Sequence, residues 1–154
     1  MQVFTRNLVF LLKIYIFPVT QNEIALFQDQ ELFAGRVSPY HKPFRKGKWK
    51  VSIEEYNYSS YPPFINAGAY VMSRRTMKKI YFASHFVKQF IFDDVYYGIV
   101  SKKCGIKLFN SKNFLANPIT FIESDKKFVI AAHLGGKFDQ VENVWKDQVK
   151  VGNA

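Results

Sequence analysis

The stretch that decides how the chain is interpreted is Phe90–Gly98, which reads Phe-Ile-Phe-Asp-Asp-Val-Tyr-Tyr-Gly. Two adjacent carboxylates, Asp93 and Asp94, stand between large apolar residues, where an acid pair has little reason to lie unless it is used. Burial raises a carboxyl pKa, and a neighbouring carboxylate raises one of the two further, so the pair needs a cation, hydrogen bonds or a substrate proton. The alternative is structural, with Asp93 capping a short helix that begins near Val95. The local sequence leaves both interpretations open.

Length and composition predict one folded domain. The chain has 154 residues, of which 48% are hydrophobic and 18% aromatic, and this excludes a disordered chain. The single cysteine, Cys104, excludes an intrachain disulfide and a zinc site built from several cysteines. The apolar run 8–17 contains Lys13, is too short to span a bilayer, and is followed by no small-residue cleavage site. We therefore expect no membrane anchor or targeting signal within this chain.

The net charge of +10 raises the question of an anionic partner. A basic cluster in the range 36–50 is suited to phosphate contact, although a solvated basic loop is the simpler interpretation. No arginine-rich helix, RNA-recognition aromatic motif or zinc-finger spacing is present, so we expect no nucleic-acid partner. The cluster comprises six residues: Arg36, Lys42, Arg45, Lys46, Lys48 and Lys50.

Hydrophobic spacing and capping signals predict an α/β domain in which strands and helices alternate. Ser73 is expected to cap the helix that follows it, with Met77, Ile80 and Tyr81 facing inward. The expected strands are 31–37, 49–53, the later part of 64–73, 106–109 and 128–132, and the expected helices are 1–17 before Pro18, 74–86, 95–103 before Gly105, and 138–149.

Small residues open the stretch 64–73, where Gly68 lies between Ala67 and Ala69. Such residues leave room for a ligand or another backbone to approach. The alternative is a glycine bulge in an ordinary strand, which composition alone favours.

Short segments in a fixed order carry more information together than separately. They are Gly35-Arg36-Val37 before a Lys-Pro loop, Lys48-Trp49-Lys50-Val51-Ser52, Glu55-Tyr56, Tyr61-Pro62-Pro63-Phe64, Gly68-Ala69-Tyr70-Val71-Met72-Ser73, Asp93-Asp94-Val95-Tyr96-Tyr97-Gly98, Gly105-Ile106 and Ala132-His133. In this order and spacing, over 31–146, they resemble the β-1,3-galactosyltransferase-like glycosyltransferases of the Golgi, which include β-1,3-N-acetylglucosaminyltransferases.

The resemblance implies the C-terminal half of a GT-A type α/β fold, with a mixed sheet and flanking helices, so that 1–154 forms a single partial catalytic domain. It implies a hexosyltransferase that moves galactose or N-acetylglucosamine from a UDP-sugar to a glycan hydroxyl, in β-1,3 linkage and with inversion, for protein or lipid glycosylation. It also implies a catalytic domain on the luminal side of the Golgi membrane.

Roles for individual residues follow from the same resemblance. Asp94 matches the general base, which accepts the proton of the attacking hydroxyl, and Asp93, where the family more often has Glu, would orient the site. His133 matches a histidine that reaches the divalent metal, and neutral imidazole suits Mn²⁺; taken alone, it reads as a strand-end histidine bonded to backbone. The expected substrate-binding residues are Trp49, Tyr61, Pro62, Gly68, Ala69 and Tyr70.

One departure from the family pattern affects the expected activity. Residues 1–9 resemble those that directly follow the family's metal-binding Asp-x-Asp, so we expect that motif, the upstream nucleotide-binding part and the membrane anchor to be missing. Without the Asp-x-Asp carboxylates, Mn²⁺ would not stabilise the leaving diphosphate, and the isolated chain should be inactive.

Two other functions remain open. A non-catalytic remnant would bind glycans, or pair with an active transferase, through the aromatic segment 56–64. Metal-dependent hydrolysis by Asp93, Asp94 and His133 has suitable residue types but no recognised hydrolase spacing. In a luminal protein, the triplet Asn57-Tyr58-Ser59 would also fit an N-glycosylation site in a surface loop.

Overall fold

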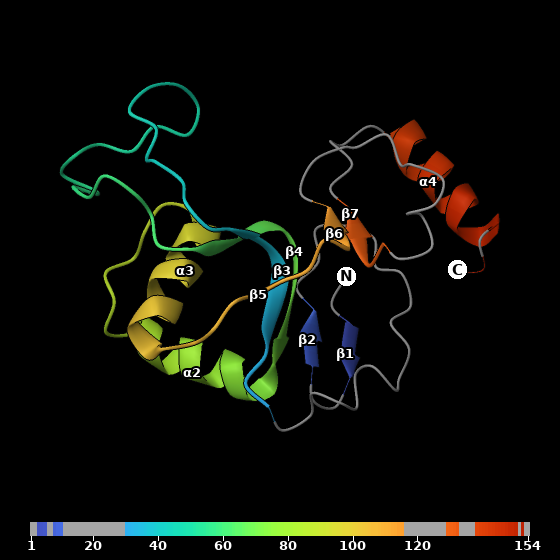
Figure 1. The fold of residues 1–154 in the computed structure, drawn as a ribbon, viewed down its shortest axis with the longest axis horizontal. Helices are drawn as coiled ribbons and strands as arrows, with labels where there is room; N and C mark the ends of the chain where they lie inside the picture. Colours follow the sequence, from blue (N-terminus) through green and yellow to red (C-terminus); the bar gives the residue numbers. More distant parts are fainter. Residues whose placement is uncertain are drawn as a thin grey trace.

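The computed structural model describes residues 3–5, 8–10, 30–115, 129–132, 138–150 and 152. Within these residues the elements run in the order shown in Figure 1. They are β1 (Val3–Thr5), β2 (Leu8–Phe10), β3 (Phe33–Ser38), β4 (Phe64–Ser73), α2 (Arg74–Ser84), α3 (Asp93–Cys104), β5 (Phe109–Asn110), β6 (Phe114–Leu115), β7 (Ala131–Ala132) and α4 (Phe138–Lys150).

The larger sheet is mixed and has the strand order β1-β2-β4-β3-β5. The pairs β1–β2, β2–β4 and β3–β4 are antiparallel, whereas β3 and β5 are parallel. A separate pair, β6 with β7, is also parallel. Helices α2 and α3 pack against β4 (Figure 1). The expected α/β class, with a mixed sheet and flanking helices, is therefore confirmed.

The core lies between this sheet and the two helices. Burial of these apolar side chains stabilises the layered arrangement, because each contributes roughly 1.5–3 kcal/mol when it is fully removed from water. Its buried members are Phe33, Ile65, Tyr70, Met72, Ile80, Val100 and Ile106.

Helix α2 begins where the sequence predicts. The Ser73 hydroxyl accepts a hydrogen bond from the Thr76 backbone N–H at 3.2 Å and another from the Leu32 N–H at 3.2 Å, so one buried side chain joins the helix start to the sheet. The helix ends at Ser84, two residues before the expected end. Tyr81 is 60% exposed and does not face inward as predicted; Thr76 is buried instead.

The helix predicted over 1–17 is wrong where the structure describes the segment. Val3–Thr5 and Leu8–Phe10 are strands, and β2 pairs with β4 from Leu8 opposite Ser73 to Phe10 opposite Val71. Short apolar runs fit either period, and β-branched residues such as Val9 suit a strand once a partner strand supplies hydrogen bonds. The remainder of 1–17 lies outside the described residues.

The strand predicted over 49–53 is also wrong. The Ser52 N–H donates to the Glu55 carboxylate at 2.9 Å, and the Glu55 N–H donates to the Ser52 hydroxyl at 3.2 Å. This reciprocal pair forms a turn, in the manner of a capping box. Val51 before it is fully buried, and its N–H reaches the Phe44 carbonyl at 2.8 Å. The segment is thus a loop anchored by Val51.

Candidate active site

The acid pair forms the first turn of α3. Phe92 is the N-cap residue and makes no side-chain cap hydrogen bond, so the interpretation of Asp93 as the cap is wrong. The Asp93 carboxylate accepts the Asp94 N–H at 3.0 Å, and the Asp94 carboxylate accepts the Val95 N–H at 2.8 Å. The free N–H groups and dipole of a helix start stabilise negative charge at both positions. Both carboxylates are thereby held at one end of the helix.

A bulge in β4 brings the small residues to this helix end. The pairing of β3 with β4 shifts between Gly35 and Val37, which lie opposite Tyr70 and Ile65. Between those pairs β3 has one residue, Arg36, whereas β4 has four, 66–69, so the additional residues must leave the regular ladder. The Ala67 backbone N–H hydrogen-bonds the Asp94 carboxylate. The small-residue stretch is therefore both a bulge and a wall of the acid site.

Burial raises the pKa of Asp94, and the charge of neighbouring Asp93 raises it further. Hydrogen bonds from the backbone of Val95 and Ala67 act in the opposite direction but do not cancel the effect of burial. A carboxylate with a raised pKa is a better proton acceptor, and a pKa nearer to neutral is what general base catalysis favours. Burial thus makes the Asp94 carboxylate more basic than an ordinary aspartate.

Two predicted substrate-binding tyrosines lie beside the acids but are buried. Tyr61 is 6% exposed, and its hydroxyl has no hydrogen-bond partner within the described part of the chain. Burial raises the pKa of Tyr61; the charge of Arg45 opposes this rise, and Tyr56 and Asp94 add to it. Tyr70 packs edge-on against Phe33 and Tyr97, and burial, Tyr97 and Asp93 raise its pKa as well. Both rings support the acid site from the protein interior.

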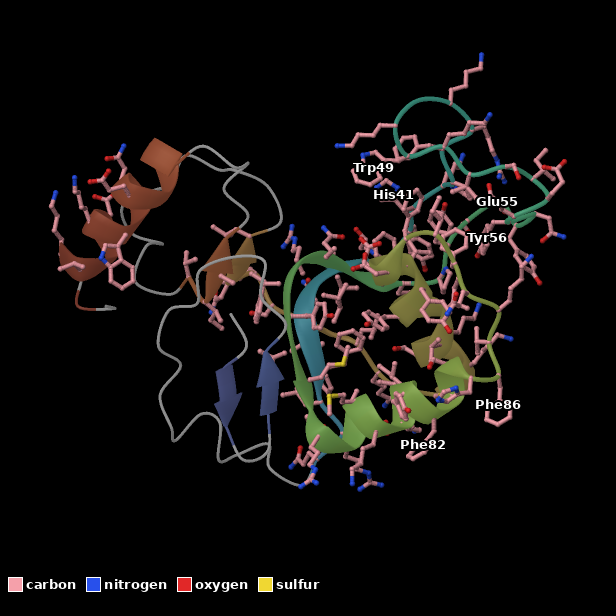
Figure 2. The ribbon with its side chains drawn as sticks, turned by 180° about the vertical axis from the view of Figure 1, so that it is seen from behind. His41, Trp49, Glu55, Tyr56, Phe82 and Phe86 are labelled. Atoms are coloured by element: carbon pink, nitrogen blue, oxygen red, sulfur yellow. The ribbon has the colours of Figure 1, made fainter. Side chains whose placement is uncertain are left out.

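Trp49 is the predicted substrate-binding residue that offers an exposed aromatic surface. Its side chain is 54% exposed, and its ring packs edge-on against Phe92, the N-cap residue of α3, at a centroid distance of 5.5 Å. Tyr56 makes a similar contact with Phe90 at 5.6 Å. Figure 2 shows Trp49 and Tyr56 on the loop between β3 and β4, above the segment that leads into α3. The exposed indole thus contacts the residue that directly precedes the acid pair, and its flat face suits a sugar ring.

The other predicted site residues are partly placed. Pro62 is buried, and Gly68 and Ala69 are half-buried within the β4 bulge. His133 lies outside the described residues, so its predicted role stays untested.

Within the described ranges, no three His, Cys, Asp or Glu side chains gather to hold a metal ion. No helix of these same ranges is both long and apolar enough to cross a membrane.

Arg45 holds the loop that carries Trp49, a role that its place in a basic cluster does not reveal. Its guanidinium donates to the carbonyls of Val51 at 3.0 Å, Ser52 at 2.9 Å, Tyr56 at 2.9 Å and Tyr58 at 3.4 Å. All six residues of the basic cluster are exposed, Arg36 on β3 and the other five on the loop between β3 and β4. A guanidinium has five N–H donors in a rigid planar fork and so can serve all four carbonyls, whereas an ammonium has three. The Arg45 side chain thus replaces the backbone ladder that this loop lacks.

Replacing Arg45 with lysine should loosen this loop while leaving the rest of the fold intact. A single ammonium cannot serve all the carbonyls, and each lost hydrogen bond costs about 1 kcal/mol. We expect amide exchange at Val51 and Tyr56 to accelerate by about tenfold or more. Lys46→Gln, at an exposed neighbouring position, is the control and should change neither rate. Unchanged exchange in Arg45→Lys would show that the arginine does not hold the loop.

Comparison with known proteins shows which family the chain belongs to. The family model described as Galactosyltransferase matches residues 1–112. The Drosophila melanogaster β-1,3-galactosyltransferase brn is 38% identical over 124 residues, which are 78% of this chain and 38% of that protein. The Caenorhabditis elegans β-1,3-galactosyltransferase bre-5 is 35% identical over 75 residues, 47% of this chain and 23% of that protein.

A third relative has a different donor sugar in its name. The lactosylceramide 1,3-N-acetyl-β-D-glucosaminyltransferase A of Xenopus laevis is 37% identical over 82 residues, 51% of this chain and 22% of that protein. The matches to these three relatives cover 38% or less of each relative's length. The resemblance inferred from the ordered segments is confirmed. The family match includes the acid pair and extends over well more than half of this chain's length, so the chain belongs to the galactosyltransferase family.

Proposed function

We propose that this chain is part of a GT-A type catalytic domain that transfers galactose or N-acetylglucosamine from a UDP-sugar to a glycan hydroxyl. The linkage is β-1,3, the reaction inverts the anomeric centre, and the enzyme acts in protein or lipid glycosylation within the Golgi lumen. Relatives named as β-1,3-galactosyltransferases and as a β-N-acetylglucosaminyltransferase support this class. The observation that carries the proposal is the half-buried Asp94 carboxylate with its raised pKa, held between α3 and the β4 bulge.

The proposed chemistry begins at the acceptor hydroxyl. Asp94 accepts its proton while the hydroxyl oxygen bonds to the anomeric carbon of the donor sugar, and the bond from that carbon to the UDP oxygen breaks. Attack from the face opposite to UDP inverts the anomeric centre. The products are the extended glycan, UDP and protonated Asp94. Trp49 holds the acceptor sugar, and the small residues Gly68 and Ala69 allow the sugar to come close to the carboxylate.

Mn²⁺ would stabilise the charge on the departing diphosphate when bound. His133 is the proposed ligand from this chain. Within the described residues no three His, Cys, Asp or Glu side chains gather to hold a metal ion, so other ligands would complete the site.

Sugar transfer by a chimera tests the proposal. The upstream part of the Drosophila relative would be joined to this chain, and UDP-galactose and UDP-N-acetylglucosamine offered with a panel of glycans and Mn²⁺. We expect UDP release together with a β-1,3-linked product identified by NMR. A correctly folded chimera that transfers neither sugar would overturn the proposal.

Glycan binding without transfer is a second candidate, favoured by the exposed Trp49 ring beside the acids. The isolated chain on a glycan array separates the two functions. Under this alternative the chain binds glycans, Trp49→Ala removes the binding, and the chimera transfers no sugar. For the other alternative, metal-dependent hydrolysis by Asp93, Asp94 and His133, the described residues provide no supporting observation.

A further inference from the structure

One motif has no part in the proposed reaction: the triplet Asn57-Tyr58-Ser59, in the loop between β3 and β4. An asparagine followed two positions later by serine, with no proline between them, is the acceptor pattern for N-linked glycosylation. The pattern occurs once in the 154 residues. Because so short a pattern also arises by chance, its place in the structure decides whether the folded chain can carry a glycan there.

The triplet is open to water over its whole length. Asn57, Tyr58 and Ser59 are all exposed, and the Tyr58 side chain is 67% exposed. In the part of the chain that the structure describes, neither the Asn57 amide nor the Ser59 hydroxyl has a hydrogen-bond partner. The amide nitrogen that would be linked to a sugar, and the hydroxyl that belongs to the acceptor pattern, are thus both accessible.

Hydrogen bonds hold the backbone on both sides of Asn57. The Arg45 guanidinium donates to the Tyr56 carbonyl at 2.9 Å and to the Tyr58 carbonyl at 3.4 Å. The Tyr56 N–H donates to the Ser52 carbonyl at 3.1 Å, and the Tyr56 ring packs edge-on against the Tyr58 ring at a centroid distance of 5.3 Å. The Asn57 side chain takes part in none of these contacts, so an attached glycan leaves them intact.

A glycan at this position is also compatible with the proposed acceptor site. Figure 2 shows Glu55 and Tyr56, which directly precede the triplet, apart from Trp49 on the same loop. Because the Asn57 side chain is exposed, a bulky and water-soluble group has room on the solvent side of the loop. It therefore need not cover the Trp49 ring that is proposed to hold the acceptor sugar.

We propose that Asn57 carries an N-linked glycan when this chain lies in the lumen of the secretory pathway. The donor is an oligosaccharide joined through a diphosphate to a polyprenyl lipid, and the oligosaccharyltransferase of that compartment catalyses the attachment. The Asn57 amide nitrogen bonds to the anomeric carbon of the first sugar, the bond from that carbon to the phosphate oxygen breaks, and one amide proton is released as the lipid diphosphate departs. This inference rests on the luminal placement within the proposed function, but not on sugar transfer by Asp94.

Secretion of the full chain from mammalian cells tests the site. A cleavable signal peptide supplies the luminal placement, and both the medium and the cell lysate are treated with peptide N-glycosidase F. We expect the treatment to increase the electrophoretic mobility of the chain by the loss of one glycan. Because peptide N-glycosidase F converts a glycosylated asparagine into aspartate, mass spectrometry of the tryptic peptide 51–74 should find aspartate at Asn57 and unchanged asparagine at Asn66.

Two adjacent serines provide matched variants. Ser59 and Ser60 are both exposed, but only Ser59 belongs to the acceptor pattern. Asn57→Gln and Ser59→Ala should each abolish the mobility shift, whereas Ser60→Ala and the conservative Ser59→Thr should keep it. No glycan on the unaltered chain in either medium or lysate, or a shift that survives Ser59→Ala, would overturn the proposal even if the chimera transfers sugar. A glycosylated chain whose chimera transfers no sugar would support this site and overturn the transfer reaction alone.

Discussion

Asp94→Asn is expected to lower the transfer rate of the chimera about a thousandfold, which lies within the range for loss of a general base. Asparagine keeps the size of the side chain and an oxygen that can accept the Val95 N–H, which the native carboxylate accepts at 2.8 Å. It cannot accept a proton from the acceptor hydroxyl. The initial rate of UDP release with saturating donor and acceptor measures the effect. A rate within a few-fold of the unaltered chimera would contradict the assignment of Asp94 as base.

The stability of the same variant is the control against misfolding. Burial raises the pKa of Asp94 in the folded state above its unfolded value, so ionisation of this group opposes folding once the pH exceeds the unfolded pKa. Asp94→Asn removes that penalty. We therefore expect its free energy of unfolding at pH 7 to be no lower than that of the unaltered chain. At a pH below the ordinary carboxyl pKa, Asp94 is protonated in both the folded and the unfolded state. The stability advantage of Asp94→Asn over the unaltered chain should therefore disappear there.

Gly98→Ala is expected to destabilise the fold by about 2 kcal/mol, because added volume in a packed contact costs more than the gain in helix propensity returns. A Cβ at Gly98 would stand 2.6 Å from the Phe64 Cβ and 2.7 Å from the Pro63 carbonyl oxygen. The backbone at Pro63 can move only if α3 or the start of β4 moves with it. The same movement would carry the acid pair away from the β4 bulge. Urea unfolding measures the loss of stability.

Gly105→Ala is the comparison for Gly98. Gly105 ends α3 with a φ of 67°, and a Cβ there would meet nothing within 4 Å. Its substitution should cost about 1 kcal/mol through backbone strain alone. Transfer activity should fall in Gly98→Ala and stay nearly unchanged in Gly105→Ala. A Gly98→Ala chain as stable as Gly105→Ala would show that the helix does not need this close approach.

Elements whose ends carry local signals were predictable from the sequence. Ser73 at the start of α2 and Gly105 at the end of α3 act within a few residues of themselves, and both helices are confirmed. The final helix, expected over 138–149, is found as Phe138–Lys150. Local hydrogen bonds and backbone preferences determine such ends, so a single sequence contains the information.

Elements that depend on distant partners were not predictable. Strands β1 and β2 form because β2 pairs with β4, more than sixty residues away along the chain. The strand predicted over 106–109 overlaps the observed Phe109–Asn110 only at Phe109, and in the described part of 128–132 only Ala131–Ala132 is a strand. The stretch 49–53 alternates as a strand does, yet among the described residues it has only an isolated bridge from Lys50 to Phe44. Its Ser52–Glu55 pair is a readable signal that would have identified the turn.

The candidate site likewise combines features that the sequence predicted with features that depend on distant partners. The sequence predicted functional roles for Asp94 and for the small residues in 64–73, and the structure places these residues together. Composition favoured a glycine bulge in 64–73, and the structure has a bulge at 66–69; the sequence could not show its extent, because that depends on how many residues the partner strand supplies. The sequence also could not show that the Phe92 ring packs against Trp49, or that Arg45 donates hydrogen bonds to four carbonyls. These contacts join residues that are not neighbours in the chain.

The pH dependence of kcat/KM for the chimera tests the central claim most directly. If Asp94 is the base, activity is lost as the pH falls through its pKa, which burial and Asp93 raise above the ordinary aspartate value of about 3.9. Asp93→Asn removes one cause of that rise, so the acidic limb should move to lower pH. An acidic limb that lies at the ordinary value, or that Asp93→Asn leaves in place, would contradict Asp94 as the group that accepts the proton.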